Sequence, residues 1–382
     1  MSEKMQEAAA ITKIWRTGGG DNARRGLFPD PVQLDPKPIH ALHAQGSVQA
    51  STVFDRHGCA YIADMAGGVQ SYSAEFNQRW RTRLEGGVSA TPALHSSGQR
   101  LYAGTHAGWI YALDASNGES IWEKEIPSKS DPRILSDLLY LPSSNALVLS
   151  SWGGRFLALN ADDGRELFSW NAGISPDSAA SADSQETIYS LRVIWDQGVQ
   201  LIAVSPSGNE KVLFTQPLER RPANRIPVSA APVIDEERGV LYMAANVNQE
   251  CLLHAWHIQS GKPVWRRRFP KNIIAEPTLM QDGALAVSCL DGFVYVLSPD
   301  NELRFRYASD CEYLLSSSAC AGGGIFVGDP LGWIHQITPA GVGRTLFESP
   351  RAIQSRPSFD PKGRLYVSST DRNVYVFNNK LM

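Results

Sequence analysis

The sequence predicts an all-β fold, a single eight-bladed β-propeller of four-stranded antiparallel blades, and two observations carry this prediction. The first is a repeated pattern of two apolar strands around a small polar turn, followed by a Gly- or Asn-bearing turn and a strand with an aromatic residue. Its clearest copies lie at 101–122, 147–168, 285–305 and 365–377. The second is a period of roughly 40 to 50 residues, which is typical of propeller blades.

The blades are counted from the aromatic residue of the last strand, which a Gly or Asn precedes by four positions in the better copies. The turn residue suits a positive φ, and the bulky ring suits a strand that packs against the neighbouring blade. Seven copies carry such an anchor, and the copy that ends in GNEKVLF at 208–214 is the weakest. The anchors are Trp80, Trp122, Phe168, Leu213 or Phe214, Trp265, Phe305 and Phe347.

The final unit ends at Met382 without an aromatic strand, whereas TKIWRT at 12–17 matches the last strand of the other copies. We therefore expect the N-terminal strand around Trp15 to complete the final blade and close the ring. A seven-bladed ring is the alternative if 174–221 is an insertion. Residues 1–10 are expected to be disordered, and 11–382 to form one domain. The predicted blades are 46–86, 87–131, 132–173, 174–221, 222–271, 272–311, 312–350, and 351–382 with 11–17.

Composition narrows the class of protein. The net charge is −3, from 36 basic and 39 acidic side chains, which argues against nucleic acid or an anionic membrane as the main partner. The N-terminus shows no apolar leader, and no stretch approaches the length of a membrane span. The five cysteines contain no pair with metal-ligand spacing, so no metal site is predicted. These features lead us to expect a cytoplasmic monomer.

The repeat, a small residue and Pro before an apolar residue and then LYAGTHAGWIYALDASNGESIW at 101–122, resembles that of pyrroloquinoline-quinone-type β-propellers. The resemblance covers 11–17 and 46–382. WRTGGGDNARRGLFPDP at 15–31 also resembles the opening of these proteins, a Trp strand followed by a glycine-rich loop that crosses the ring. The repeat serves several unrelated functions, so the resemblance implies the fold more firmly than the activity.

The members of this family differ in the sequence features that the resemblance leads us to expect. Quinone-dependent dehydrogenases imply adjacent cysteines, a Glu/Asn/Asp calcium site and export, and the chain has no Cys-Cys pair. The outer-membrane assembly lipoprotein implies a lipid-anchor cysteine near the start, whereas the first cysteine here is Cys59. We therefore expect a cofactor-less, cytosolic member of the family.

Departures from the repeat indicate where specific chemistry could lie. The first strand of each blade should line the central channel, and several copies begin it with a proline; at the position aligned with the residue before that proline, most copies have a small residue. Three copies have a charged residue there instead, Asp137, Glu276 and Arg356. The position is occupied, blade by blade, by Ser51, Thr91, Asp137, Ala179, Ala231, Glu276, Ser317 and Arg356.

Two kinds of site follow from these departures. Asp137, Glu276 and Arg356, with Gln49 and Gln354 at the same mouth, are candidates for binding a polar ligand. The alternative is a channel whose charges are solvated or paired with one another. On the surface, the loop at 219–227 carries Arg220, Arg221 and Arg225, which suit an acidic partner.

The function that these residues favour is a non-catalytic binding or scaffold propeller. It would engage a protein partner or a small polar molecule at one face and the channel mouth. The alternative is an enzyme of small-molecule metabolism that uses the channel carboxylates and Arg356 without a quinone. A quinoprotein dehydrogenase is the third possibility. No catalytic residue and no cofactor is assigned.

Overall fold

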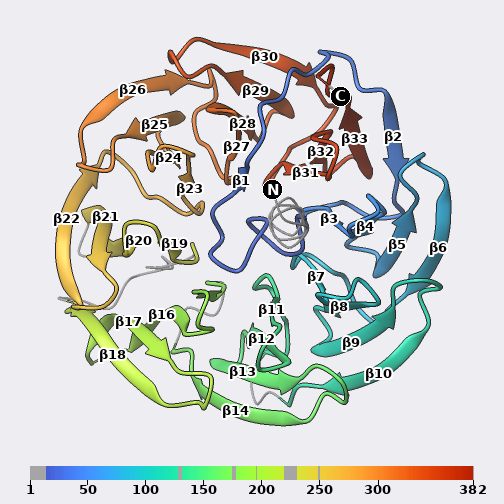
Figure 1. Cartoon of the computed structure of the whole chain (residues 1–382), viewed down its shortest axis with the longest axis horizontal. Helices are drawn as coiled ribbons and strands as arrows, with labels where there is room; N and C mark the ends of the chain where they lie inside the picture. The colour runs from blue at the N-terminus through green and yellow to red at the C-terminus, as the bar shows by residue number, and fades with distance from the viewer. Residues whose placement is uncertain are drawn as a thin grey trace, which may run out of the picture.

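The computed structural model describes residues 14–127, 131–173, 178–194, 196–218, 230–247 and 250–381. Over these ranges the chain contains strands and no helix, and the strands form eight sheets arranged as a ring (Figure 1). The weak copy of the repeat forms a complete four-stranded sheet, so the alternative of seven blades does not hold. The prediction of an eight-bladed propeller is confirmed.

Apart from two N-terminal strands that join blades 7 and 8, the strands of each blade run in chain order from the channel to the rim (Figure 1). Blades 1 to 4 contain β3 (Val53–Phe54), β4 (Ala60–Ala63), β5 (Gly68–Tyr72), β6 (Gln78–Arg83), β7 (Ala93–Leu94), β8 (Arg100–Gly104), β9 (Trp109–Asp114), β10 (Ser120–Glu125), β11 (Leu139–Leu141), β12 (Ala146–Ser151), β13 (Arg155–Asn160), β14 (Glu166–Asn171), β15 (Ser181–Ala182), β16 (Ile188–Ile194), β17 (Gly198–Val204) and β18 (Glu210–Gln216).

Blades 5 to 8 follow the same order, and two N-terminal strands join the last two of them. Their strands are β19 (Val233–Asp235), β20 (Val240–Val247), β21 (Glu250–His257), β22 (Lys262–Phe269), β23 (Thr278–Leu279), β24 (Leu285–Ser288), β25 (Phe293–Leu297), β26 (Leu303–Ala308), β27 (Ala319–Ala321), β28 (Gly324–Gly328), β29 (Trp333–Ile337), β30 (Gly343–Glu348), β31 (Ser358–Phe359), β32 (Leu365–Ser368) and β33 (Asn373–Phe377), with β1 (Leu27–Phe28) and β2 (His40–His43).

The strand that closes the ring is β2, and the expectation that the segment around Trp15 does so is wrong. β2 pairs antiparallel with β33, with His40 opposite Val376 and His43 opposite Asn373. Trp15 instead lies in the channel, where its side chain is buried. An apolar aromatic residue can be buried in either place, and the ring needs both a closing strand and a filling for its centre. The short β2 lacks an aromatic anchor, so it does not show the pattern of the other last strands.

Every outer strand with an aromatic anchor contains a β-bulge directly before that anchor. In β10, for example, Ser120 and Trp122 pair with consecutive residues of β9, so Ile121 is the extra residue. In β18 the extra residue is Leu213, which makes Phe214 the anchor of the weak copy. A bulge bends and twists an edge strand and so hinders pairing with another chain. The extra residues are Arg79, Ile121, Leu167, Leu213, Val264, Arg304 and Leu346.

The aromatic anchors join neighbouring blades. The indole N–H of Trp80 donates to the carbonyl of Ala115 at 2.9 Å, and that of Trp122 donates to the carbonyl of Ala161 at 3.1 Å. A Cβ atom on Gly118 would lie 2.4 Å from the Trp80 ring, so the turn of one blade packs against the ring of the preceding one. The turn glycine therefore has two roles, a positive φ and room for the ring.

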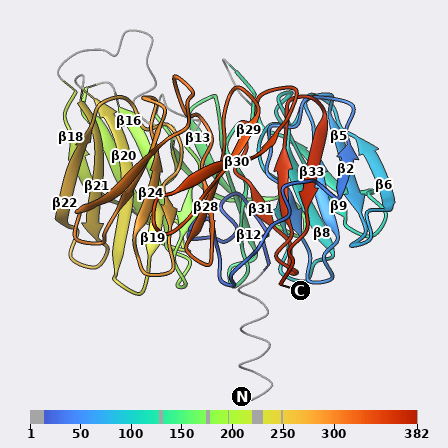
Figure 2. The same cartoon turned by 90° about the horizontal axis from the view of Figure 1, so that it is seen from above.

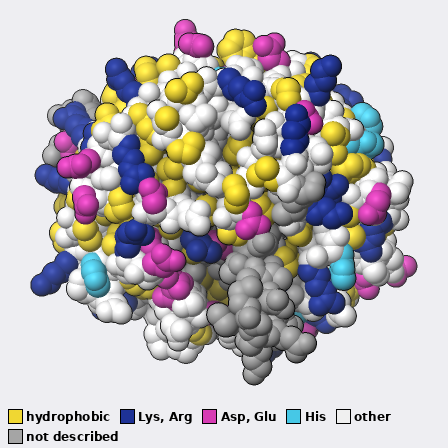
Figure 3. Space-filling model, turned by 45° about the horizontal axis from the view of Figure 1, so that its top comes forward, with side chains coloured by type: hydrophobic (Ala, Val, Ile, Leu, Met, Phe, Trp, Pro, Cys, Tyr) yellow, Lys and Arg dark blue, Asp and Glu magenta, His cyan; other side chains and the backbone are white. Residues whose placement is uncertain are grey.

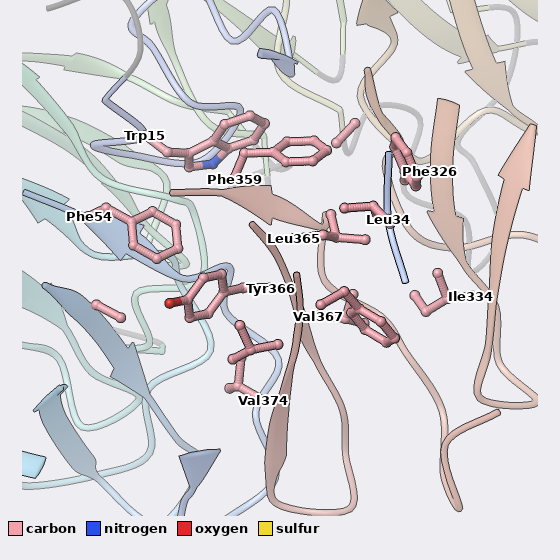
Figure 4. Packing of buried hydrophobic residues seen from close by; sticks show 14 of the residues in the cluster. Trp15, Leu34, Phe54, Phe326, Ile334, Phe359, Leu365, Tyr366, Val367 and Val374 are labelled. Atoms are coloured by element: carbon pink, nitrogen blue, oxygen red, sulfur yellow. The ribbon is translucent and has the colours of Figure 1, made fainter. Parts of the chain in front are cut away.

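The core consists of apolar layers between blades, and the last blade packs against N-terminal residues as well as its neighbours. Trp15 and Phe28 both lie against Phe359 of β31, with ring centroids 6.2 and 5.2 Å apart (Figure 4). Phe54 of blade 1 meets Tyr366 of blade 8 edge-on at 4.7 Å. The seam between the first and last blades is thus packed with buried aromatic side chains.

The molecule has two loop-bearing faces, with the strands running between them (Figure 2). On the side shown in Figure 3, acidic and basic side chains are interspersed with apolar ones rather than gathered into a field of one sign. The inner strands run along the channel from one face of the ring to the other. Residues just before these strands therefore lie at one end of the channel, and residues just after them lie at the opposite end.

Candidate functional site

The channel is filled by residues 15–28, which we call the channel segment. Its carbonyl groups accept hydrogen bonds from the inner strands of successive blades around the ring. The carbonyls of Trp15 and Arg16 bind the N–H groups of Phe54 and Leu94, at 2.7 and 2.9 Å. Later carbonyls continue this order through blades 4 to 7, in the pairs Asn22 with Ala182, Ala23 with Ile234, Arg25 with Leu279, and Gly26 with Cys320.

The remaining two blades are bound in other ways. In blade 3, the Thr17 hydroxyl donates to the carbonyl of Leu138, and the Asn22 amide donates to the carbonyl of Tyr140 at 3.0 Å. Blade 8 packs against Trp15 and Phe28 through Phe359. One short segment therefore contacts all eight blades and satisfies backbone groups that an inner edge strand would leave unpaired.

Arg24 is the most deeply buried charge in the channel segment, with a fully enclosed side chain. Its guanidinium donates to the carbonyls of Ala180 at 2.5 Å, Gly18 at 3.1 Å and Asp137 at 3.0 Å. It also lies 3.4 Å from the Asp137 carboxylate and 3.8 Å from that of Glu276. A buried cation is stable only with such partners.

Arg356 precedes β31 of blade 8 and pairs with one of the same acids, Glu276. Its guanidinium lies 3.1 Å from the Glu276 carboxylate and donates to the carbonyls of Glu276 and Pro277 at 3.2 and 3.3 Å. Burial lowers the pKa of the Arg356 guanidinium from its ordinary value, while the Glu276 carboxylate acts in the opposite direction. Arg24, Asp137, Glu276 and Arg356 thus form one cluster with two charges of each sign, here called the channel cluster.

The glycine run of the channel segment makes room for this cluster. A Cβ atom on Gly18 would lie 1.9 Å from the Asp137 carboxylate. A Cβ atom on Gly19 would lie 2.6 Å from the Arg356 guanidinium and 2.7 Å from the Cα of Arg24, and the φ of Gly19 is +76°. Neither distance is open to a real side chain, so glycine is required at both positions.

At one end of the channel, the cluster borders a cavity of about 180 Å³, here called the mouth. All five residues that the sequence predicted for the channel lie around it: Gln49, Asp137, Glu276, Gln354 and Arg356. The carboxylates of Asp137 and Glu276 are 26% and 14% exposed, whereas the Arg24 and Arg356 side chains are 0% and 3% exposed. The mouth therefore presents oxygen acceptors above buried cations. That these residues bind a ligand stays a prediction.

Further hydrogen bonds connect the residues of the channel cluster to neighbouring blades. The other Asp137 oxygen accepts the Thr91 N–H at 2.6 Å, and the Glu276 N–H donates to the Ser317 hydroxyl at 2.9 Å. The Ser51 hydroxyl donates to the carbonyl of Arg356 at 3.0 Å. Residues at the same position in neighbouring blades are thus linked around the mouth.

Sequence reasoning missed Arg24, which is central to the cluster. Its signal was the run GGGDNARRG, because glycines allow close approach of the backbone to other groups and the two arginines need partners. The surface candidates Arg220, Arg221 and Arg225 lie outside the described residues, so their role stays a prediction.

The described residues also bear on metal sites and membrane spans. Over the ranges that the structure describes, no group of three or more His, Cys, Asp or Glu side chains is placed to hold a metal ion. Nor does the described part of the chain contain a helix long and apolar enough to span a membrane.

Comparison with known proteins yields consistent relatives. A family model described as "Outer membrane protein assembly factor BamB" matches residues 65–250. The protein of that name from Yersinia pestis is 21% identical over 350 residues, covering 87% of this chain and 80% of the relative. That from Bordetella pertussis (strain Tohama I) is 26% identical over 314 residues, covering 81% and 73%. The crystal structure of BamB from Moraxella catarrhalis superposes with a TM-score of 0.73 at 19% identity, covering 91% of this chain and 98% of that one.

These relatives correct one expectation. The sequence led us to expect a cytoplasmic protein, and this is wrong, because the curated relatives are named outer membrane protein assembly factors. The expectation rested on the first residues of the given sequence and on the position of Cys59, which say nothing about the fold.

Proposed function

The chain carries the repeat of the pyrroloquinoline-quinone-type β-propellers, and on this premise we propose that it is a non-catalytic scaffold that binds a protein partner during outer-membrane protein assembly. The part of this proposal that concerns outer-membrane protein assembly is supported by the names of its relatives. The partner would bind at the face that carries the mouth, where the acceptors of Asp137, Glu276 and Gln354 are accessible.

One observation carries the choice of a scaffold over an enzyme. The four charged side chains of the channel cluster pair with one another, and the channel segment fills the space between the inner strands. A general base needs a carboxylate that can accept a proton from a substrate. The Glu276 carboxylate is already paired with two guanidiniums, those of Arg24 and Arg356, so its oxygens are engaged within the protein.

The proposal is tested by removing the gene from the organism that encodes it and measuring the amount of folded outer-membrane β-barrel protein. We expect the amount to fall and to recover when the full chain is supplied. Unchanged amounts of folded barrel protein would overturn the proposal.

A parallel assay addresses the enzymatic alternatives. The purified chain is incubated with pyrroloquinoline quinone, calcium, a panel of alcohols and an electron-accepting dye. We expect no dye reduction above that of a sample without protein. Reduction that depends on the chain, on the quinone and on an alcohol would instead favour a dehydrogenase.

A further inference from the structure

The end of the channel opposite the mouth opens into a larger cavity of about 390 Å³, here called the cup. Residues that follow the inner strands of blades 3 to 6 form its outer walls, and the channel segment forms its inner wall. The volume lies within the range of about 300 to 1,000 Å³ that is usual for small-molecule pockets. It can therefore accommodate large side chains of another molecule.

The floor of the cup is apolar. Ile234, Leu279 and Met280 contribute side chains that are almost wholly buried, and Leu27 and Ala182 lie beside them. These residues are held by the backbone bonds between the channel segment and the inner strands, such as that of the Leu279 N–H to the Arg25 carbonyl at 2.8 Å. A rigid apolar floor favours an occupant that contributes an apolar group of its own.

The walls and rim of the cup are acidic. Six carboxylates contribute to the lining and only two guanidiniums do. Both guanidiniums are already paired, since Arg25 lies 2.6 Å from Asp21 and Arg238 lies 3.1 Å from Asp235. Among the ion pairs of the described residues, the exposed Glu236 and Glu237 have no basic partner. Within the described residues, the lining of the cup thus carries more negative charge than its two guanidiniums balance.

This negative charge acts on Arg25 in the inner wall of the cup. The pKa of the Arg25 guanidinium is raised above its ordinary value, first by Asp21 and to a smaller extent by Glu236 and Glu237. Clefts lined by charge of one sign concentrate ligands of the opposite sign and speed their association. Such a field favours a cationic occupant.

We propose that the cup docks a segment of a partner protein in which basic side chains alternate with apolar ones. The apolar side chain would lie on the floor formed by Ile234, Leu279 and Met280, and the basic ones would pair with Glu236 and Glu237. The inference rests on the proposed scaffold function and adds a second docking site, on the face opposite the mouth.

The test uses the full chain and a fluorescein-labelled peptide, Gly-Lys-Leu-Arg-Leu-Lys-Gly, whose binding is followed by fluorescence anisotropy. One comparison peptide has glutamates in place of the basic residues, and another has glycines in place of the leucines. We expect the first peptide to bind at least tenfold more tightly than either comparison peptide. Its affinity should fall as the salt concentration rises from about 50 to about 300 mM, because salt screens exposed charges. Absence of binding, or equal binding of all three peptides, would overturn the proposal.

Three variants locate the binding. Ser184→Trp places a large ring at the exposed rim without changing charge, and we expect it to weaken binding of the first peptide at least tenfold. The double variant Glu236→Gln with Glu237→Gln is expected to weaken it about two- to tenfold, as for two exposed ion pairs. The control, Glu123→Gln with Glu125→Gln, removes the same charge from β10, an outer strand that does not line the cup, and should leave affinity unchanged. Equal affinities for all variants would show that the peptide binds elsewhere.

The two proposals can fail separately. If the peptide does not bind but loss of the gene lowers folded barrel protein, only the cup proposal is overturned. If the peptide binds in the cup and loss of the gene has no effect on barrel protein, the scaffold function in assembly is overturned.

Discussion

The inner and outer strands of each blade both have a backbone edge that no strand of the same blade pairs with, but the two edges have very different surroundings. Inner strands such as β7 and β19 face the channel, where the channel segment binds their free N–H groups. Outer strands such as β10 and β22 face solvent, and a bulge before each aromatic anchor interrupts their ladder. Stability at the inner end therefore depends on specific partners, whereas the outer end depends on geometry that tolerates many side chains.

The charges at the two ends differ in the same way. Arg24 is enclosed with two acids, whereas Arg304 on β26 and Arg155 on β13 lie in exposed ion pairs on the outside. Buried pairs are costly to break, and exposed pairs contribute little. If the comparison is right, matched substitutions should separate the two ends clearly, and four such tests follow in order of expected effect.

The largest effect is expected for Arg24→Met. Removing the guanidinium leaves Asp137 without its buried partner and leaves Glu276 with Arg356 alone, which should lower the free energy of unfolding by about 3–5 kcal/mol. Arg25→Met is the matched control, because Arg25 is the next residue and its pair with Asp21 is about one-third exposed. It should cost less than about 1 kcal/mol. Urea denaturation measures both, and equal losses would show that the cluster adds nothing to stability.

The second effect concerns His254 on β21 of blade 5, whose ring lies toward Phe214 of blade 4. Its ring packs near Phe214 and Trp256, and burial lowers its pKa to about 4, with Arg266 as a further cause. The unfolded imidazole takes up its proton near pH 6.5 and the folded one near pH 4, so stability should fall as the pH drops between these values.

The loss from His254 should reach about 2–3 kcal/mol near pH 4, because each unit of pKa shift corresponds to about 1.4 kcal/mol. His254→Phe should reduce this dependence, and His57→Gln, an exposed site, should leave it unchanged. Urea denaturation at several pH values provides the measurement. Identical pH profiles for the wild type and His254→Phe would contradict the prediction.

The third effect separates close approach from backbone strain. Gly19 and Gly261 both have positive φ, +76° and +61°, but a Cβ atom would collide with the channel cluster only at Gly19 and would meet nothing within 4 Å at Gly261. Gly261→Ala should therefore cost only the strain of a left-handed residue, about 1–2 kcal/mol. Gly19→Ala should cost about 1–3 kcal/mol more, as for overpacking. Equal losses in thermal denaturation would mean that the segment shifts freely within the channel.

The smallest effect is expected at the outer edge. Val264 is the extra residue of the bulge in β22 and is half exposed, whereas Val233 of the inner strand β19 is fully buried. Val264→Thr should change the free energy of unfolding by less than about 0.5 kcal/mol. Val233→Thr, which buries an additional hydroxyl, should cost about 1–3 kcal/mol. A loss at Val264 as large as that at Val233 would show that the outer strands are not tolerant.

Much of the ring could be predicted because each blade repeats the same local chemistry. The seven aromatic anchors are visible in the sequence, and each of them follows a bulge in the structure, with Phe214 as the fourth. The position before the proline was also visible, and it places Asp137, Glu276 and Arg356 at one cavity. Both predictions depend on register within a blade, which local pattern determines.

Predictions that depended on contacts between distant segments were less successful. Either the segment around Trp15 or β2 could have closed the ring. In the structure Trp15 lies in the channel, and β2 pairs with β33. Arg24 was missed because its partners come from blades 3 and 6, far along the chain. The cup likewise joins the channel segment to four blades.

The sequence by itself thus determined the architecture of this protein: eight blades, their anchors and turns, and the charged departures at the channel. Only the tertiary structure decided that β2 closes the ring, that residues 15–28 fill its centre, and that the charges pair. The physical reason is that a blade is stabilised by neighbours in sequence, whose spacing repeats. The channel is instead a meeting point of one segment with all the blades, and its geometry exists only once the ring has closed.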